Sequence, residues 1–144
     1  TSWAADNRSF YDAAGKALAE KPLFMRTVSE TRSPAQQKLY DRLLEKKMNP
    51  SSFGFAAHTY DAVQLLASAM KQANSTEGPK LRAALEDLNT PYNGLMKTYN
   101  KPFSKTVHEG LQADSYVWIK WNDGKLNPYS DDIIKSLQPS DFKK

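Results

Sequence analysis

The most informative segment of this chain is FGFAAHTYDAVQLLASAMKQA, from Phe53 to Ala73. Its apolar residues recur at three- and four-residue steps, the spacing of neighbours on one face of an α-helix. The main stripe consists of Ala56, Tyr60, Val63, Leu66, Ala67 and Met70. Three more apolar residues widen this stripe to a second face: Ala57, Leu65 and Ala69. The pattern predicts a long helix over residues 53–74 that is buried on more than one side.

A shorter helix and a strand are predicted ahead of this segment. Apolar residues at helical spacing indicate a helix over residues 8–19, with Asp6 or Asn7 as its N-cap. The run LFMRTV, residues 23–28, follows a proline and is short and partly β-branched. These features predict a strand there.

Two further helices flank the long one. In SPAQQKLYDRLLEKK, residues 33–47, Ser33 suits the N-cap and Pro34 the first helical position, where its missing N–H costs nothing. After the long segment, residues 77–88 repeat the amphipathic pattern over a shorter length. Both segments are therefore predicted to be helices with one buried side.

The character of the sequence changes after Pro91. Residues 92–99 and 115–121 are aromatic and β-branched and predict strands. Asn122-Asp123-Gly124 is a hairpin signal, and the following LNPY is its returning strand. A last short helix is predicted around Ile133. The fold class is α/β, helix-rich with a few short strands and a hairpin near the C-terminus.

The bulk composition is that of an ordinary globular protein. The 20 basic residues are scattered among 16 acidic ones, so the net charge of +4 favours a solvated surface over a nucleic-acid-binding face. Without cysteine there are no disulfides, thiolate metal sites or cysteine nucleophiles. No apolar run reaches the roughly 18 residues of a membrane-spanning helix. Because Thr1 is not a natural start and no signal peptide is visible, we interpret the sequence as a mature form or a fragment.

Motifs for enzymatic chemistry are mostly missing from the sequence. There is no phosphate-binding loop, dinucleotide fingerprint or nucleophile elbow. His58 and His108 lie 50 residues apart without a second ligand at helical or turn spacing, so we expect neither a metal nor a cofactor. His108 and Glu109 are adjacent, and a small hydrolase that uses this pair is one hypothesis. His58 is interpreted either as a ligand contact or as a partly buried structural histidine.

The order of the motifs resembles a known family. It runs FYDAAGKALAE, SPAQQKLYDRLLEKK, FAAHTYDAVQLLASAMKQANSTEGPKLRAALEDL, YNGLMKTY, SYVWIKW and NDGKLNPY. This order resembles the C-terminal portion of type I periplasmic solute-binding proteins, of the leucine/isoleucine/valine-binding kind, which serve ABC transporters. In that family a helix with a Tyr-Asp-Ala step, here Tyr60-Asp61-Ala62, precedes a short helix, a strand with a glycine, here Gly94, and a closing hairpin.

The resemblance implies a two-lobe α/β fold with three crossover strands and a ligand cleft between the lobes. Residues 1–30 would form a segment of the second lobe, and residues 31–90 the helical segment of the first lobe. Residues 91–144 would supply strands and the C-terminal tail. Because such a piece draws on both lobes, a domain-swapped or fragment dimer is a further hypothesis.

The implied function is that of a non-enzymatic substrate-binding component of an ABC importer, in the bacterial periplasm or outside the cytoplasm. Its partners would be a membrane permease and a small solute, either a branched-chain amino acid or an aromatic carboxylate. The expected ligand contacts are Ser2, Trp3, Phe55 and His58. In amino-acid-binding relatives a carboxylate in the turn before the first helix pairs with the ligand's ammonium group. No glutamate stands in residues 1–6, so Trp3 could instead stack on a flat acid.

Another class of function also fits the sequence. The chain could be a helical protein-interaction module with no small-molecule ligand, which docks a partner through its aromatic hairpin. Saturable binding of a small solute would distinguish the solute-binding function from this one.

Overall fold

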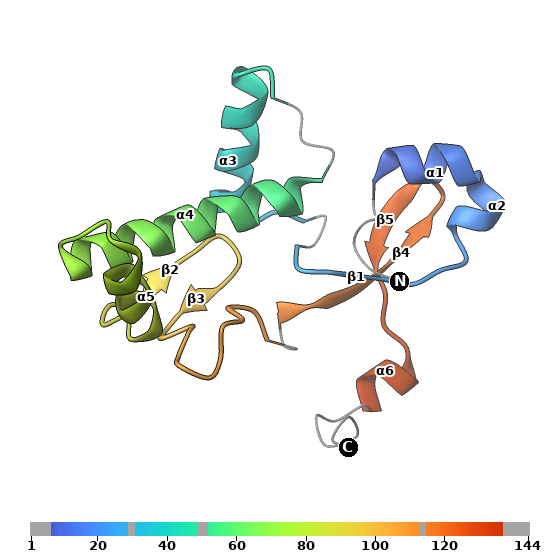
Figure 1. Cartoon of the computed structure of the whole chain (residues 1–144). Helices are drawn as coiled ribbons and strands as arrows, with labels where there is room; N and C mark the ends of the chain where they lie inside the picture. Colours follow the sequence, from blue (N-terminus) through green and yellow to red (C-terminus); the bar gives the residue numbers. More distant parts are fainter. Residues whose placement is uncertain (1–6, 29–30, 49–51, 113–114, 137–144) are drawn as a thin grey trace. The chain divides into compact units, whose positions relative to one another are not determined.

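The structure, a computed structural model, describes residues 7–28, 31–48, 52–112 and 115–136 (Figure 1). The chain divides into two compact units. The first unit comprises residues 1–30 and 117–144, and the second comprises residues 31–116. In the described part of the chain, no helix is both long and apolar enough to cross a membrane.

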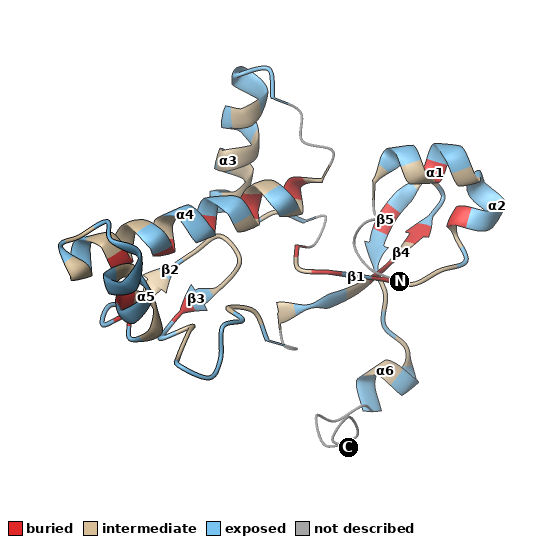
Figure 2. Ribbon diagram, viewed as in Figure 1, coloured by how far each residue is buried: buried red, intermediate tan, exposed pale blue. Residues whose placement is uncertain are grey.

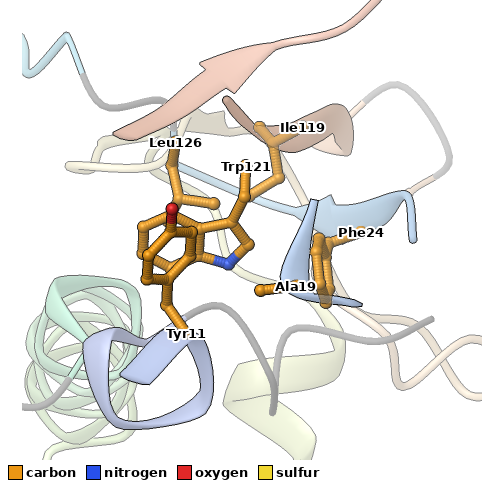
Figure 3. Packing of buried hydrophobic residues seen from close by; sticks show 6 residues of the cluster. All are labelled: Tyr11, Ala19, Phe24, Ile119, Trp121 and Leu126. Atoms are coloured by element: carbon orange, nitrogen blue, oxygen red, sulfur yellow. The ribbon is translucent and has the colours of Figure 1, made fainter. Parts of the chain in front are cut away.

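The first unit is built around a three-stranded antiparallel sheet. Its strands are β1 (Phe24–Arg26), β4 (Val117–Asn122) and β5 (Lys125–Pro128), in the order β1-β4-β5. Helices α1 (Arg8–Ala14) and α2 (Lys16–Ala19) pack on it, and α6 (Asp132–Ser136) follows β5. The core of this unit consists of Tyr11, Ala19, Phe24, Ile119, Trp121 and Leu126 (Figure 3).

The prediction of one helix over residues 8–19 is wrong in one respect. Gly15 has φ +73° and ψ 155°, outside the helical region, and it separates α1 from α2. Glycine adopts such a conformation without the steric cost that a Cβ would add. The N-cap is Asn7, whose side chain accepts a hydrogen bond from the Phe10 N–H at 3.0 Å.

The predicted hairpin is confirmed. Residues Asn122 and Lys125 pair across a two-residue turn in which Asp123 has φ +49° and Gly124 has φ +73°. Two left-handed residues match the twist of the flanking strands. Lys16 Nζ lies 2.6 Å from the Asp123 carboxylate, which ties α2 to this turn.

The described part of the second unit consists of three helices and a small hairpin. Its helices are α3 (Pro34–Glu45), α4 (Phe53–Ala73) and α5 (Gly78–Glu86). The predicted cap of α3 is confirmed, since the Ser33 side chain accepts from the Gln36 N–H and Pro34 takes the first helical position. The Gln36 side chain accepts in turn from the Ser33 N–H at 3.0 Å, which completes a capping box.

The strand predicted over residues 92–99 is a two-stranded hairpin. Strands β2 (Tyr92–Asn93) and β3 (Thr98–Tyr99) pair antiparallel, with Tyr92 opposite Tyr99. Their rings stack at 6.0 Å between centroids. The prediction missed the turn because residues 94–97 carry only one conventional turn former, Gly94.

Helix α4 buries only one of its two predicted apolar sides, the one that contains Ala57, Leu65 and Ala69 (Figure 2). Its buried residues form an inner line at four-residue steps: Phe53, Ala57, Asp61, Leu65 and Ala69. The main predicted stripe, from Ala56 to Met70, lies on another side of the helix and is called the outer stripe below. Within it, Tyr60 is 42%, Val63 57% and Leu66 38% exposed. The helix is thus apolar on two sides, and the described chain covers only one of them.

The inner line packs on α5 and on the hairpin. Leu65 and Ala69 form one core with Ala84, Leu88 and Tyr99. Near the C-terminal end of α4, the Gln72 side chain links this helix to the backbone that follows α5. Its amide donates to the Asp87 carbonyl at 2.8 Å and accepts from the Asn89 N–H at 2.9 Å.

Asp61 is the buried carboxylate of this core, at 1% exposure. One of its oxygens accepts hydrogen bonds from the Tyr92 hydroxyl at 3.2 Å and the Leu95 N–H at 2.7 Å. The other accepts from the Met96 N–H at 2.9 Å and the Tyr99 hydroxyl at 3.2 Å. A buried charge needs such partners to offset its lost hydration, and here the hairpin supplies all four.

We predict that Gly94→Ala destabilises the protein. A Cβ on Gly94 would lie 2.5 Å from Asp61 Oδ2 and 2.6 Å from Tyr99 Cε2, closer than nonbonded atoms approach. The strain should lower the free energy of unfolding by about 2–3 kcal/mol, measured by urea denaturation. Gly78→Ala is the matched control, because nothing lies within 4 Å of its added Cβ. Equal stability of the two variants would contradict the prediction.

Candidate functional site

The predicted site residues fall in two places. Phe55 and His58 lie in the first two turns of α4, with Phe55 51% exposed and His58 partly buried. The hydroxyl of Thr59 donates to the Phe55 carbonyl at 2.9 Å. Ser2 and Trp3 lie outside the described residues. Their grouping with Phe55 and His58 therefore stays a prediction.

His58 borders a hollow of about 310 Å³ in the second unit. Helices α4 and α5, strand β3 and the segment after it form its walls. Most of the side chains that line it are apolar or aromatic: Leu65, Leu66, Leu85, Tyr99, Phe103 and Leu111. Ala62 and Gly110 complete the lining. Phe55 is not part of this lining, so the two predicted α4 residues do not share the hollow.

One wall of the hollow is a close contact between two aromatic rings and a glycine. A Cβ on Gly110 would lie 3.4 Å from the Phe103 ring and 3.7 Å from that of Tyr99. These are ordinary van der Waals distances, so Gly110 packs against both rings. The segment that contains Gly110 and Leu111 thereby contributes to the lining of the hollow.

The imidazole of His58 is the polar group of this hollow. Burial lowers the pKa of His58, and the nearby Asp61 carboxylate opposes this effect more weakly. Desolvation disfavours the charged ring, so His58 is neutral at pH 7. A neutral imidazole has one donor and one acceptor nitrogen, and it can orient a polar group without adding charge.

The hollow therefore suits the apolar part of a small solute. Ligand sites are commonly apolar hollows of about 300–1,000 Å³ with a few placed polar groups, and this one lies at the lower end. Its described lining contains no cationic side chain to bind a carboxylate. A carboxylate of the solute would need partners elsewhere.

The structure pairs His108 with Glu86 rather than with the adjacent Glu109. His108 Nε2 lies 3.2 Å from Glu86 Oε1, and the same oxygen accepts a hydrogen bond from Arg82 Nε at 2.7 Å. The Arg82 guanidinium, and less strongly His108, hold the pKa of Glu86 below its usual range. Glu86 is therefore ionised at neutral pH and engaged by two partners. Glu86 and Arg82 of α5 thus form a cluster with His108, and Glu109 is not part of it. This arrangement gives no support to the hypothesis of a hydrolase that uses His108 and Glu109.

No group of three or more histidine and carboxylate side chains among the described residues is placed to hold a metal ion.

Asp61 organises the second unit, but sequence reasoning identified it only as part of the Tyr-Asp-Ala step. Its role depends on contacts 31 to 38 residues away along the chain. One signal pointed to it: an aspartate in an otherwise apolar helical segment needs partners if that side is buried. The hollow itself could not be predicted, because its walls come from four separate segments.

Comparison with known proteins shows the fold. No family model matches the sequence, and no curated protein is significantly similar to it. Among solved structures, an extracellular ligand-binding receptor from Rhodopseudomonas palustris matches 86% of this chain, with 22% identity and a TM-score of 0.61. A type 1 periplasmic binding protein from Bordetella pertussis matches 89%, with 22% identity and a TM-score of 0.63. A leucine-binding protein from Thermotoga maritima matches 90%, with 19% identity and a TM-score of 0.61.

This chain spans 38%, 37% and 35% of the lengths of those three proteins, respectively. The chain therefore corresponds to a part of the α/β fold of the type I periplasmic binding proteins. The expected fold class is confirmed.

We predict that the hydrogen bonds to Asp61 make folding sensitive to high pH. Burial, together with the Asp61 carboxylate, raises the pKa of Tyr92 to about 12 and raises that of Tyr99 as well. The unfolded tyrosines lose their protons first, near pH 10. The stabilisation is complete below pH 10 and is lost as the pH rises toward 12.

Tyr92→Phe should reduce this loss by on the order of 1 kcal/mol between pH 10 and 12, measured by urea denaturation at each pH. Tyr40→Phe is the control, because Tyr40 packs on Phe53 at the other end of α4. Identical pH profiles for the wild type and Tyr92→Phe would contradict the prediction.

We predict that His58 titrates below its ordinary pKa of 6.5. Its depressed pKa means that the unfolded chain binds the proton first. The stability contributed by neutral His58 is therefore present above pH 6.5 and is lost as the pH falls through the folded pKa. Proton NMR of the two imidazole rings measures this directly, and His108→Gln assigns the signals. A His58 midpoint at or above 6.5 would show that the ring is not desolvated.

Proposed function

We propose that this chain belongs to the substrate-binding component of an ABC importer outside the bacterial cytoplasm. The observation that carries the proposal is the shared fold over 86–90% of the chain with proteins described as ligand-binding receptors or periplasmic binding proteins. The component would bind a small solute without catalysis and deliver it to a membrane permease. Since the chain spans less than two fifths of those proteins, the whole activity belongs to the proposal.

The division into two units supports an arrangement in two lobes. Residues 1–30 would belong to the second lobe and residues 31–90 to the first. The segment over residues 91–144 would be shared, because residues up to 116 cluster with the second unit and those from 117 with the first. The solute would bind in a cleft between the lobes, and closure of the lobes would exclude water from it.

The proposed solute is a branched-chain amino acid or an aromatic carboxylate. One solved protein of the same fold is described as a leucine-binding protein, which supports the first class. The apolar, aromatic hollow beside His58 is compatible with either side chain. We assign solute contact to Ser2, Trp3, Phe55 and His58, with Trp3 stacking on a flat ligand.

The uncovered outer stripe of α4 favours a second candidate, the protein-interaction module without a small solute. Monomeric proteins seldom leave large apolar side chains grouped on one helix face, and such groups mark interaction sites. Tyr60, Val63 and Leu66 form such a group. The two candidates differ in their response to small solutes.

The test is a binding titration of the natural full-length protein. Leucine, isoleucine, valine, phenylalanine, benzoate and 4-hydroxybenzoate are added in turn, and tryptophan fluorescence and calorimetric heat are recorded. We expect saturable binding of at least one class. Phe55→Ala should weaken it about tenfold or more, because a large ligand-facing ring would be lost.

Leu44→Ala is the matched control for this substitution, since Leu44 is similarly exposed, at 45%, but lies on α3. If the folded protein gives no saturable signal with any amino acid or aromatic acid, the solute-binding proposal is rejected in favour of the interaction module.

A further inference from the structure

The segment that follows β3, residues 101–111, contacts the C-terminal end of α5 and is called the strap below. Two polar ties hold it there. Lys101 Nζ lies 2.7 Å from Asp87 Oδ1, and His108 Nε2 lies 3.2 Å from Glu86 Oε1. Among the described residues, no other hydrogen bond or ion pair joins the strap to α4, α5 or the β2–β3 hairpin. Two neighbouring carboxylates thus fix the strap on α5.

Between the two ties the strap bonds to itself. The Ser104 N–H donates to the Val107 carbonyl at 2.8 Å, and the Ser104 hydroxyl accepts from the Val107 N–H at 3.1 Å. Lys101, at the start of the strap, has φ +44°, a region that residues with a Cβ seldom adopt. Such a conformation persists where surrounding contacts hold it, and the tie to Asp87 is one of them.

The strap also supplies walls to two hollows. Phe103 lines both the hollow of about 310 Å³ beside His58 and a second one of about 510 Å³, which His108 borders. Phe103 and Leu111 pack against the core of the second unit. A movement of the strap away from α5 would withdraw these side chains. The extent of the hollow beside His58 therefore depends on where the strap lies.

We propose that the strap is a movable wall of this hollow and that the proton on His108 controls how firmly it is held. A histidine side chain changes its charge between about pH 5 and 8. Charged His108 forms an ion pair with Glu86, whereas neutral His108 retains only a hydrogen bond. The strap is therefore held most firmly in mildly acidic solution and opens more often as the pH rises.

The charges around His108 set the size of this effect. Glu86 and Arg82 face it from α5, and Arg82 Nε donates to the same Glu86 oxygen at 2.7 Å. Arg82 thus neutralises part of the carboxylate. On the strap itself, Lys105 and Glu109 are exposed to solvent. Because the His108 side chain is 59% exposed as well, we expect an effect of about threefold rather than a large one.

The pH range follows from the two partners. Arg82, and less strongly His108, hold the pKa of Glu86 below 4.5, so Glu86 is ionised above that pH. The tie is strongest where His108 is also charged, and that contribution is lost as the pH rises. His58, across the hollow, acts with the opposite sign, since burial lowers its pKa and its contribution is lost as the pH falls. A comparison of variants separates the two histidines.

The experiment is hydrogen exchange of the natural full-length protein without ligand, read by mass spectrometry at about pH 5.5, 6.5 and 7.5. Rates for peptides within residues 101–111 are divided by the chemical exchange rate at each pH. From pH 5.5 to 7.5, the protection of the strap should fall about threefold relative to His108→Gln. The effect of a moving strap on solute exchange rests on the proposed function, but this measurement does not, so a failed solute titration would leave it unaffected.

Four variants identify the tie. His108→Gln keeps a hydrogen-bonding side chain that takes up no proton, and Glu86→Gln removes the charge of its partner, so both should abolish the pH dependence. Glu109→Gln is the matched control, because it removes a carboxylate beside His108 that is not part of the tie. Lys101→Met should loosen the strap equally at every pH, since it breaks the other tie.

Three results would overturn the proposal. Equal pH profiles for the wild type and His108→Gln would show that the tie does not respond to the proton. An effect of Glu109→Gln as large as that of Glu86→Gln would show only a general influence of nearby acidic groups. Unchanged protection in Glu86→Gln/Lys101→Met would show that other contacts of the full-length protein hold the strap.

Discussion

The second unit depends on one buried charge, the carboxylate of Asp61. A carboxylate at 1% exposure is tolerated only because two backbone N–H groups and two tyrosine hydroxyls donate to it. All four donors come from the β2–β3 hairpin, so the charge fixes the hairpin on α4 at one register. The Tyr99 ring, oriented by that bond, then becomes part of both the core and the hollow beside His58. Gly94 leaves the space in which the carboxylate approaches the hairpin.

The same residue explains why the sequence ranked the two apolar sides of α4 in the wrong order. Periodicity identifies apolar positions, and it made the stripe with Tyr60 and Val63 the main one and the side with Leu65 the minor one. The side that is buried instead includes Asp61, which a hydrophobic pattern excludes. A hydropathy pattern carries no information about the four hydrogen-bond donors of a distant hairpin, which offset the lost hydration of the Asp61 carboxylate. What the sequence did indicate correctly was a helix with apolar residues on more than one side.

Local rules were reliable wherever the cause of a structure was itself local. The Ser33 and Pro34 start of α3 and the Asn122–Gly124 turn follow from a cap and from backbone preferences. Gly15 has the same kind of local cause, yet the helical spacing around it masked the break. The hollow had no local signal, since Leu85, Phe103 and Gly110 meet His58 only in the folded unit. The sequence nevertheless singled out His58, because a polar residue near the start of an apolar helix is notable.

Helix α4 contributes to two surfaces that would select for different chemistry. On one side, the hollow combines aromatic walls with an imidazole that burial keeps neutral, which favours an uncharged apolar group. On the other, Tyr60 borders a groove that is lined by apolar and cationic side chains of α3. Desolvation acts on the first surface, whereas the lysines and the arginine of the second are exposed to solvent. The two sides of α4 therefore differ in chemistry, an apolar hollow with a neutral imidazole on one and a groove with a cationic border on the other.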